Sequence, residues 1–281
     1  MTIKVDPSQL EAGIPHRKIL IAGLACTLIC LYLSDLNVIT GTKYFSFFGG
    51  LAFLSAVIWG SDTVKTLQSY GLATGHPSAG VIAVAAGLLP MVFASRFGLA
   101  APLVAIIIAA VIGIILGFVA NEVLMMRIPV MISAIMELAV IGTCMLLGLS
   151  AGIIGGYSWN DLMTGAGGST FSGSFVGGGI LILAFIMAAI ALSHPFNATS
   201  SGPNWKQDRM LMLAAECGCL SLIIATIISF AFVGAVPAII SLAIAVIGWI
   251  WSYSRFIALS KRDAAAWLDA KPIPEPEGLD S

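Results

Sequence analysis

Residues 99–120 read LAAPLVAIIIAAVIGIILGFVA, a stretch of 22 apolar or small residues without a charged side chain. A helix rises about 1.5 Å per residue, so roughly 20 such residues cross the ~30 Å hydrocarbon layer of a membrane. Because lipid offers no hydrogen-bond partner to an open backbone, a segment of this kind has to be helical. The stretch therefore predicts a membrane-spanning helix.

Similar apolar stretches recur along the chain, separated by short polar breaks. Their length is about twice that of the ~10-residue alternating strands of a membrane β-barrel, which excludes that fold. The predicted fold class is an all-α, polytopic membrane helix bundle. We predict about eight transmembrane helices, at residues 19–33, 44–60, 80–94, 99–120, 131–153, 176–192, 210–232 and 237–256.

The overall composition agrees with a protein that lives mainly in lipid. Of the 281 residues, 59 % are hydrophobic and 10 % are charged, and the mean hydropathy is +1.02. A soluble domain needs about a quarter of its surface residues charged. The formal net charge of -1 also excludes a strongly basic face, so we expect no nucleic-acid partner.

The distribution of cations predicts the orientation in the cell membrane, because short loops rich in Lys and Arg stay in the cytoplasm. With both termini inside, every Lys and Arg except Lys43 and Arg96 lies on the cytoplasmic side. We expect a cytoplasmic N-terminal lead at 1–18, an integral membrane helical domain at 19–257, and a polar cytoplasmic C-terminal tail at 258–281.

Two carboxylates fall inside predicted spans. Glu137 and Glu216 each lie about two helical turns from the cytoplasmic side, with Ser133 and Ser221 nearby on the same helices. Ionisable residues at membrane depth usually face the bundle interior or an aqueous cavity, and oxygen ligands suit alkali cations. These four residues are our candidates for an ion pathway. The alternative is that each glutamate is protonated or bonds across a helix interface, without any ion.

Other polar residues within or beside the spans carry less chemistry. Cys217 and Cys219 alternate along one helix, so their thiols point to different faces and packing is the expected role. Asp62 and Arg96 lie at membrane interfaces, where they serve as markers of topology rather than as ligands. The sequence does not specify a metal.

Small residues predict two close helix contacts. Gly113 and Gly117 are four residues apart in one span, and Gly148 and Gly152 have the same spacing in the next. This spacing allows helix backbones to approach each other closely.

Two predicted cytoplasmic loops each contain a His-Pro pair. One pair is His76 and Pro77; the other is His194 and Pro195, followed by Asn197. The residue before a proline is held extended, so both histidines are expected to project from turns. They could form a docking surface for an anionic thiol or a soluble partner, or be ordinary turns. If they are matched positions, the chain is a 4+4 pseudo-repeat of parallel halves.

The order of several short motifs resembles a known family. The runs at 69–78 (SYGLATGHPS), 127–131 (RIPVM) and 194–197 (HPFN), with the later QDR at 207–209, are similar to those of the C subunit of the tetrahydromethanopterin S-methyltransferase of methanogenic archaea. The likeness covers most of the chain.

This resemblance implies a role in methanogenesis. The family's complex transfers a methyl group from methyl-tetrahydromethanopterin, through a corrinoid on a partner protein, to coenzyme M, and it translocates sodium ions. The C subunit would pack with the D and E membrane subunits among archaeal ether lipids. It would bind no cofactor itself, a sodium ion aside, and the isolated chain would not be catalytic. The family's ion-coupling carboxylate is placed on the E subunit, so that role is not transferred to either glutamate here.

Two other functions remain open at this point. One is a stand-alone secondary transporter of a small anion or metabolite, for which eight helices and a duplication would suffice. The other is a passive scaffold that only seals a complex against lipid.

Overall fold

The chain is a helical bundle, which confirms the predicted all-α class. The computed structural model describes residues 13–69, 76–157, 179, 182–193 and 207–270, and this part of the chain contains no strand. Its α-helices are α1 (His16–Ser34), α2 (Leu36–Thr40), α3 (Phe47–Ser69), α4 (His76–Ala94), α5 (Ala101–Phe118), α6 (Met131–Ile154), α9 (Gln207–Val233) and α10 (Ala235–Ala270), with shorter helical turns at Tyr44–Ser46, Ser95–Ala100 and Val119–Val123.

Six helical runs within the described residues are long and apolar enough to cross a membrane. Two of the predicted spans lie in the separate helices α4 and α5, which together occupy the 40-residue stretch Val84–Val123; between them the backbone at Gly98 is non-helical (φ 54°, ψ -128°). Of the predicted span 176–192, the described residues include the shorter apolar helix Ile182–Ser193. The count of eight transmembrane helices therefore stays a prediction.

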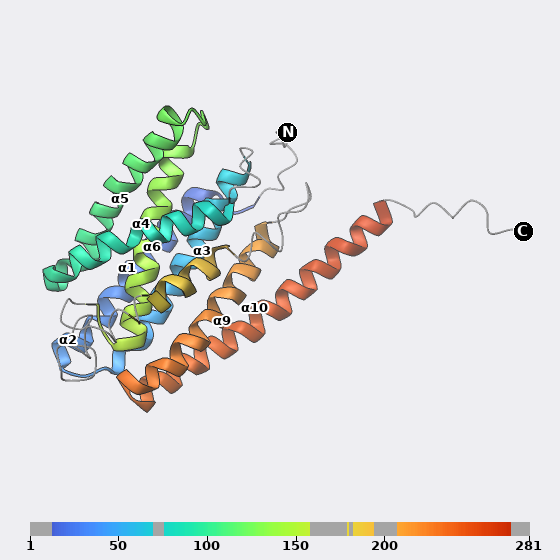
Figure 1. Cartoon of the computed structure of the whole chain (residues 1–281). Helices are drawn as coiled ribbons and strands as arrows, with labels where there is room; N and C mark the ends of the chain where they lie inside the picture. Colours follow the sequence, from blue (N-terminus) through green and yellow to red (C-terminus); the bar gives the residue numbers. More distant parts are fainter. Residues whose placement is uncertain (1–12, 70–75, 158–178, 180–181, 194–206, 271–281) are drawn as a thin grey trace, which may run out of the picture.

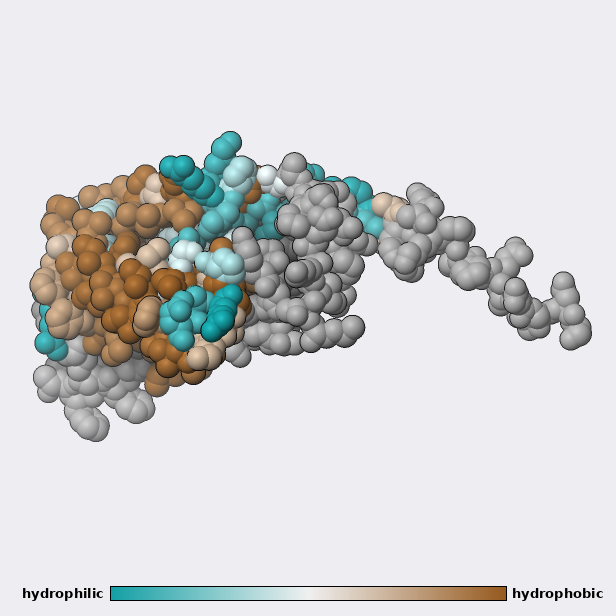
Figure 2. All heavy atoms as spheres, turned by 90° about the horizontal axis from the view of Figure 1, so that it is seen from above, coloured by the Kyte–Doolittle hydropathy of each residue, from teal (hydrophilic) through white to brown (hydrophobic). Residues whose placement is uncertain are grey.

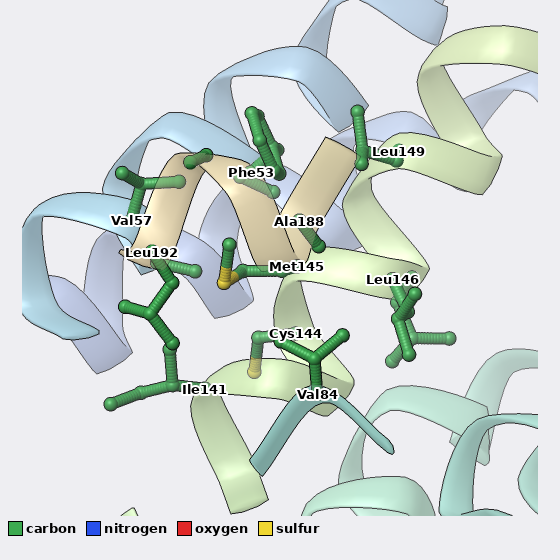
Figure 3. Close-up of a cluster of buried hydrophobic side chains, with 14 of the residues drawn as sticks. Phe53, Val57, Val84, Ile141, Cys144, Met145, Leu146, Leu149, Ala188 and Leu192 are labelled. Atoms are coloured by element: carbon green, nitrogen blue, oxygen red, sulfur yellow. The ribbon is translucent and has the colours of Figure 1, made fainter. Parts of the chain in front are cut away.

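Helix α6 is the centre of the bundle. It packs against α3, α4, α5 and α9, and in its most apolar window 72 % of the residues are buried, against 22 % in α1 and 28 % in α10. Figure 1 shows α6 running between α3 and α5, with α9 and α10 side by side at the edge of the bundle. Figure 3 shows the core around α6, where Met145 and Leu149 lie near Phe53 of α3 and Ala188.

The outer surface of the bundle is apolar. Large side chains such as Ile107 on α5 (63 % exposed) and Ile247 on α10 (68 % exposed) point away from the core. Figure 2 shows hydrophobic residues over most of the described surface visible in that view. A water-soluble protein rarely exposes so large an apolar area, and such a surface is typical of one that contacts lipid or other proteins.

Glycines allow α6 to approach two neighbouring helices. A Cβ added at Gly113 of α5 would lie 2.6 Å from Met136 Cα, and one at Gly148 of α6 would lie 2.8 Å from the Gly49 carbonyl oxygen of α3. At Gly117 the nearest atom would be Ile132 Cα, at 2.7 Å, and at Gly152 it would be the Gly50 nitrogen, at 3.3 Å. Backbone atoms of facing helices thus come into contact at both glycine pairs.

Helix α10 is longer than its predicted span. With 36 residues it is roughly 54 Å long, well above the ~30 Å of a hydrocarbon layer. It ends at Ala270, shortly before Pro272, so it includes the first part of the predicted polar tail. Figure 1 shows its last turns extending beyond the other helices. Arg262 pairs with Asp208 at 3.1 Å, which ties this extension to the start of α9.

The close contact at Gly113 can be tested with one methyl group. We expect Gly113→Ala to lower the free energy of unfolding by about 1–3 kcal/mol, the usual effect of overpacking, because the new Cβ meets backbone atoms. Denaturation of the detergent-solubilised protein measures this change. The matched control is Ile114→Ala on the same helix, where the side chain is 45 % exposed and we expect a smaller effect. Equal effects of the two variants would contradict the close contact.

Candidate functional site

A buried ion-paired cluster lies where one end of α1, α3 and α6 meet. The His16 imidazole, at the first residue of α1, lies between two carboxylates: Nδ1 is 2.8 Å from Asp62 Oδ2 of α3, and Nε2 is 3.1 Å from Glu137 Oε2 of α6. The side chains of Asp62 and Glu137 are 1 % and 11 % exposed, and that of His16 is 31 % exposed. We call these three residues the carboxylate–histidine bridge.

Hydrogen bonds from neighbouring residues hold the bridge in place. The Thr63 hydroxyl donates to Glu137 Oε2 at 3.1 Å, and Gln207 Nε2, at the start of α9, donates to Asp62 Oδ1 at 2.7 Å. The Gln207 amide also binds the backbone just before α1, accepting from the Ile14 N–H at 2.8 Å and donating to the Ile14 carbonyl at 3.1 Å. Four helices are therefore joined through one polar network.

The geometry determines the charge of the bridge. A neutral imidazole has one donor and one acceptor nitrogen, and an ionised carboxylate only accepts. Both ring nitrogens face carboxylate oxygens, so both N···O contacts are hydrogen bonds only when each holds one proton. Two protons shared by two carboxylates and an imidazole leave a net charge of about -1, whichever atoms carry them.

Glu216 belongs to a different interface. Its Oε1 accepts from the Trp249 indole N–H of α10 at 3.2 Å, and the neighbouring Cys217 thiol contacts its Oε2 at 3.2 Å. Glu216 is 7 % exposed. It lies on the side of α9 that faces α10, whereas Gly218 faces Leu54 and Val57 of α3.

The structure thus separates residues that the sequence analysis grouped. Glu137 and Glu216 have different partners on different helices. Ser133 is exposed, and its hydroxyl donates to the Val130 carbonyl at 3.0 Å; Ser221 is buried. Among the residues described, neither serine hydrogen-bonds either glutamate, so the ion-pathway role of these four residues stays a hypothesis.

The predicted docking loops are described only in part. His76 and Pro77 are the first two residues of α4 rather than part of a turn before it; proline is well tolerated in the first turn of a helix because no intrahelical N–H bond is lost there. His194, Pro195 and Asn197 lie outside the described residues.

Sequence reasoning missed most of the bridge. The sequence pattern does not indicate His16, and it indicates only a topology marker at Asp62, because both residues lie at predicted membrane interfaces where charges are common. One feature of the sequence could have indicated the site: the predicted topology places His16, Asp62, Glu137 and Gln207 near the same side of the membrane. Only the packing of α1, α3, α6 and α9 brings these residues together.

A second polar cluster occupies the opposite end of the same helices. The buried Tyr157 hydroxyl, just after α6, donates to Asp35 Oδ2 at the end of α1 at 2.5 Å. Burial, and then the Asp35 carboxylate, raise the pKa of Tyr157, so the phenol remains a donor. Asn37 Nδ2 donates to the Gly155 carbonyl at 3.2 Å. These residues and Lys43 line a cavity of about 470 Å³.

The described residues do not form a cluster of typical metal ligands. No group of three or more His, Cys, Asp or Glu side chains in this part of the chain has the arrangement of a metal site. The five cysteines are unpaired thiols, three of them buried. The bundle thus offers ion pairs and apolar packing.

Comparison with known proteins identifies the family. A family model described as the C subunit of tetrahydromethanopterin S-methyltransferase matches residues 1–277. The chain is 39 % identical to the C subunit of this methyltransferase from Methanosarcina barkeri over 272 residues, which cover 96 % of this chain and 97 % of that protein. The corresponding protein of Methanothermobacter thermautotrophicus is 32 % identical over 262 residues, 91 % of each chain.

The chain belongs to the family of C subunits of tetrahydromethanopterin S-methyltransferase. The resemblance found in the short sequence motifs is thereby confirmed. Since the family is named as one component of a methyltransferase, the chain is part of a multi-subunit methyltransferase complex. The carboxylate–histidine bridge is therefore a feature of one subunit of that complex.

The cluster at the opposite end can be tested by removing one hydroxyl. We expect Tyr157→Phe to lower the free energy of unfolding by about 1.5–3 kcal/mol, because a buried carboxylate loses a charge-assisted hydrogen bond. Denaturation in detergent micelles measures the change. Tyr253→Phe is the control, since Tyr253 is 44 % exposed and its loss of a hydroxyl should cost less than about 0.5 kcal/mol. Equal stability of both variants would show that the Asp35 contact contributes nothing.

Proposed function

We propose that this chain is the integral membrane C subunit of a sodium-translocating complex in the cell membrane of a methanogen. The complex transfers a methyl group from methyl-tetrahydromethanopterin to coenzyme M through a corrinoid held by a partner protein. In this proposal the chain packs with the D and E subunits and with ether lipids, has both termini in the cytoplasm, and performs no covalent step. Family membership supports it, as do six helical segments of membrane-spanning length among the described residues.

The carboxylate–histidine bridge is the observation that carries the ion-translocating part of the proposal. Its two carboxylates are buried in an apolar bundle, where charged groups are costly and usually mark ion or proton pathways. Asp62 and Glu137 supply hard oxygen atoms, and Thr63 adds a hydroxyl, a ligand set that suits an alkali cation. The same network would join four helices in a passive scaffold too, but the cost of burying a net negative charge favours an ion path.

The coupling must come from a change between two states of the complex. In the proposed complex the corrinoid of the partner protein would carry the methyl group, and its loading and unloading would alter the contacts of that protein. A partner that contacts the bundle differently in the two states then changes access to the buried carboxylates. The role of this chain is to provide part of the ion path and a fixed wall around it.

Purification tests the assignment to a complex. We expect the chain, isolated in mild detergent from its own organism, to bring down the other methyltransferase subunits together with a corrinoid absorption band. A monodisperse particle of this single chain, without a corrinoid band, would contradict the proposal and favour the stand-alone transporter. The control repeats the purification at high salt, which screens exposed charge contacts. Soluble proteins that adhere only through such contacts are then removed.

Removal of one buried charge tests the ion path. In the intact complex, we expect Glu137→Gln to slow sodium-dependent methyl transfer at limiting sodium by at least about tenfold, because the amide no longer attracts a cation. Glu216→Gln tests the second carboxylate in the same assay. The matched control is Glu122→Gln, at an exposed position, which should behave as the wild type. Unchanged sodium dependence in both the Glu137 and the Glu216 variant would reduce the chain to a scaffold.

A further inference from the structure

The position of His16 suggests how one end of the ion path is closed. We propose that the His16 imidazole is a tethered cation that occupies the space between Asp62 and Glu137, and that an entering monovalent cation displaces it. This inference rests on the proposed function and adds a gating residue to it. His16 would act as a positioning residue, since it controls access to the carboxylates without taking part in methyl transfer.

Relative exposure places His16 at the mouth of the site. The side chain of His16 is 31 % exposed, that of Glu137 is 11 % exposed, and that of Asp62 is 1 % exposed. The imidazole is therefore closer to the aqueous end of the bundle than the two carboxylates are. The charge distribution predicts that this end faces the cytoplasm. While both of its nitrogens are bonded, Asp62 Oδ2 and Glu137 Oε2 are engaged by the protein itself.

The exchange is balanced in charge. With the carboxylates ionised, the imidazole holds both bridging protons and carries one positive charge. A monovalent cation that takes its place leaves the charge between Asp62 and Glu137 unchanged, whereas a divalent cation would add a charge. The displaced imidazolium can turn to the aqueous end of the bundle, where its charge is solvated at little cost.

The remaining side chains are arranged to receive a hard cation. Thr63 presents its hydroxyl oxygen beside Glu137 Oε2. Gln207 holds Asp62 by its other carboxylate oxygen, Oδ1, so Asp62 stays in place when Oδ2 is released. The three atoms that would face the cation are oxygens of Asp62, Glu137 and Thr63. Oxygen ligands favour alkali cations over soft metals.

The attachment of His16 allows it to move. It is the first residue of α1, directly after Pro15, and no side chain caps this helix end. The first turn of a helix lacks part of its intrahelical hydrogen bonds and opens more easily than its middle. The Gln207 amide keeps Ile14 attached to α9, so His16 can swing out without release of the chain before it.

Substitutions at His16 in the intact complex test the inference. The initial rate of methyl transfer is measured against sodium concentration, and the quantity compared is the half-saturating sodium concentration. We expect His16→Gln, which removes the competing charge, to lower it by at least about fivefold, the low end of typical couplings between sites. His16→Lys, which restores a tethered cation, should bring the value back towards that of the wild type. A residue that only stabilises the fold would change the melting temperature without this shift.

Arg17→Gln is the matched control. Arg17 is the next residue in α1, is exposed, and loses the same unit of charge without touching the bridge. An equal shift in Arg17→Gln and His16→Gln would overturn the inference in favour of a general surface-charge effect. So would an unchanged half-saturating concentration in His16→Gln, or a His16→Lys variant that behaves like His16→Gln.

A second measurement uses the unmodified complex, so that a failure of a variant to assemble does not prevent the test. Infrared difference spectra recorded on adding sodium chloride should show linked changes in imidazole and carboxylate bands, and choline chloride should not produce them. No sodium-specific change in these bands would overturn the inference. A wild-type complex whose methyl transfer does not depend on sodium at all would overturn the proposed function itself, so the two failures are distinguishable.

Discussion

A hydrocarbon layer offers neither a hydrogen bond nor a counter-charge, and this constraint governs the whole molecule. Backbone groups must be satisfied within each segment, which makes the chain helical. Ionisable groups must find partners on other helices, which brings Asp62 and Glu137 to opposite sides of the same imidazole. Helices α3 and α6, which carry the two carboxylates, also approach each other closely where Gly148 meets Gly49.

Hydropathy alone is sufficient for the fold class and for the approximate positions of the long helices, but it does not predict the short helix α2. It was less informative about helix ends, because helices continue into polar sequence that a hydropathy window excludes. Helix α1 begins at His16, three residues before its predicted span, and α10 continues to Ala270, past the predicted end at 256. Alanine favours helix, and the extension stops before Pro272. The number of spans depends on the junction at Gly98, where the sequence does not distinguish a turn from a continuous helix.

The site was predictable only in its most visible member. A carboxylate in the middle of an apolar run is conspicuous, so Glu137 and Glu216 were found, but equal depth does not imply proximity. Gly218 of α9 faces α3, and Glu216, two residues earlier, lies on the opposite side of the same helix. His16, Asp62 and Gln207 lie at helix ends, where polar residues are expected in any membrane protein. Their meaning depends on which helices are neighbours, and no single segment contains that information.

Helix α1 connects the two polar ends of the bundle, which links the bridge to the rest of the structure. His16 at its start binds α3 and α6, while Asp35 at its end binds Tyr157, directly after α6. Between them Gly23 packs onto Trp59 of α3. A shift of α1 as a rigid body would therefore disturb both clusters at once. A local movement of its first turn disturbs only the bridge, so opening at one end of the bundle is compatible with a closed contact at the other.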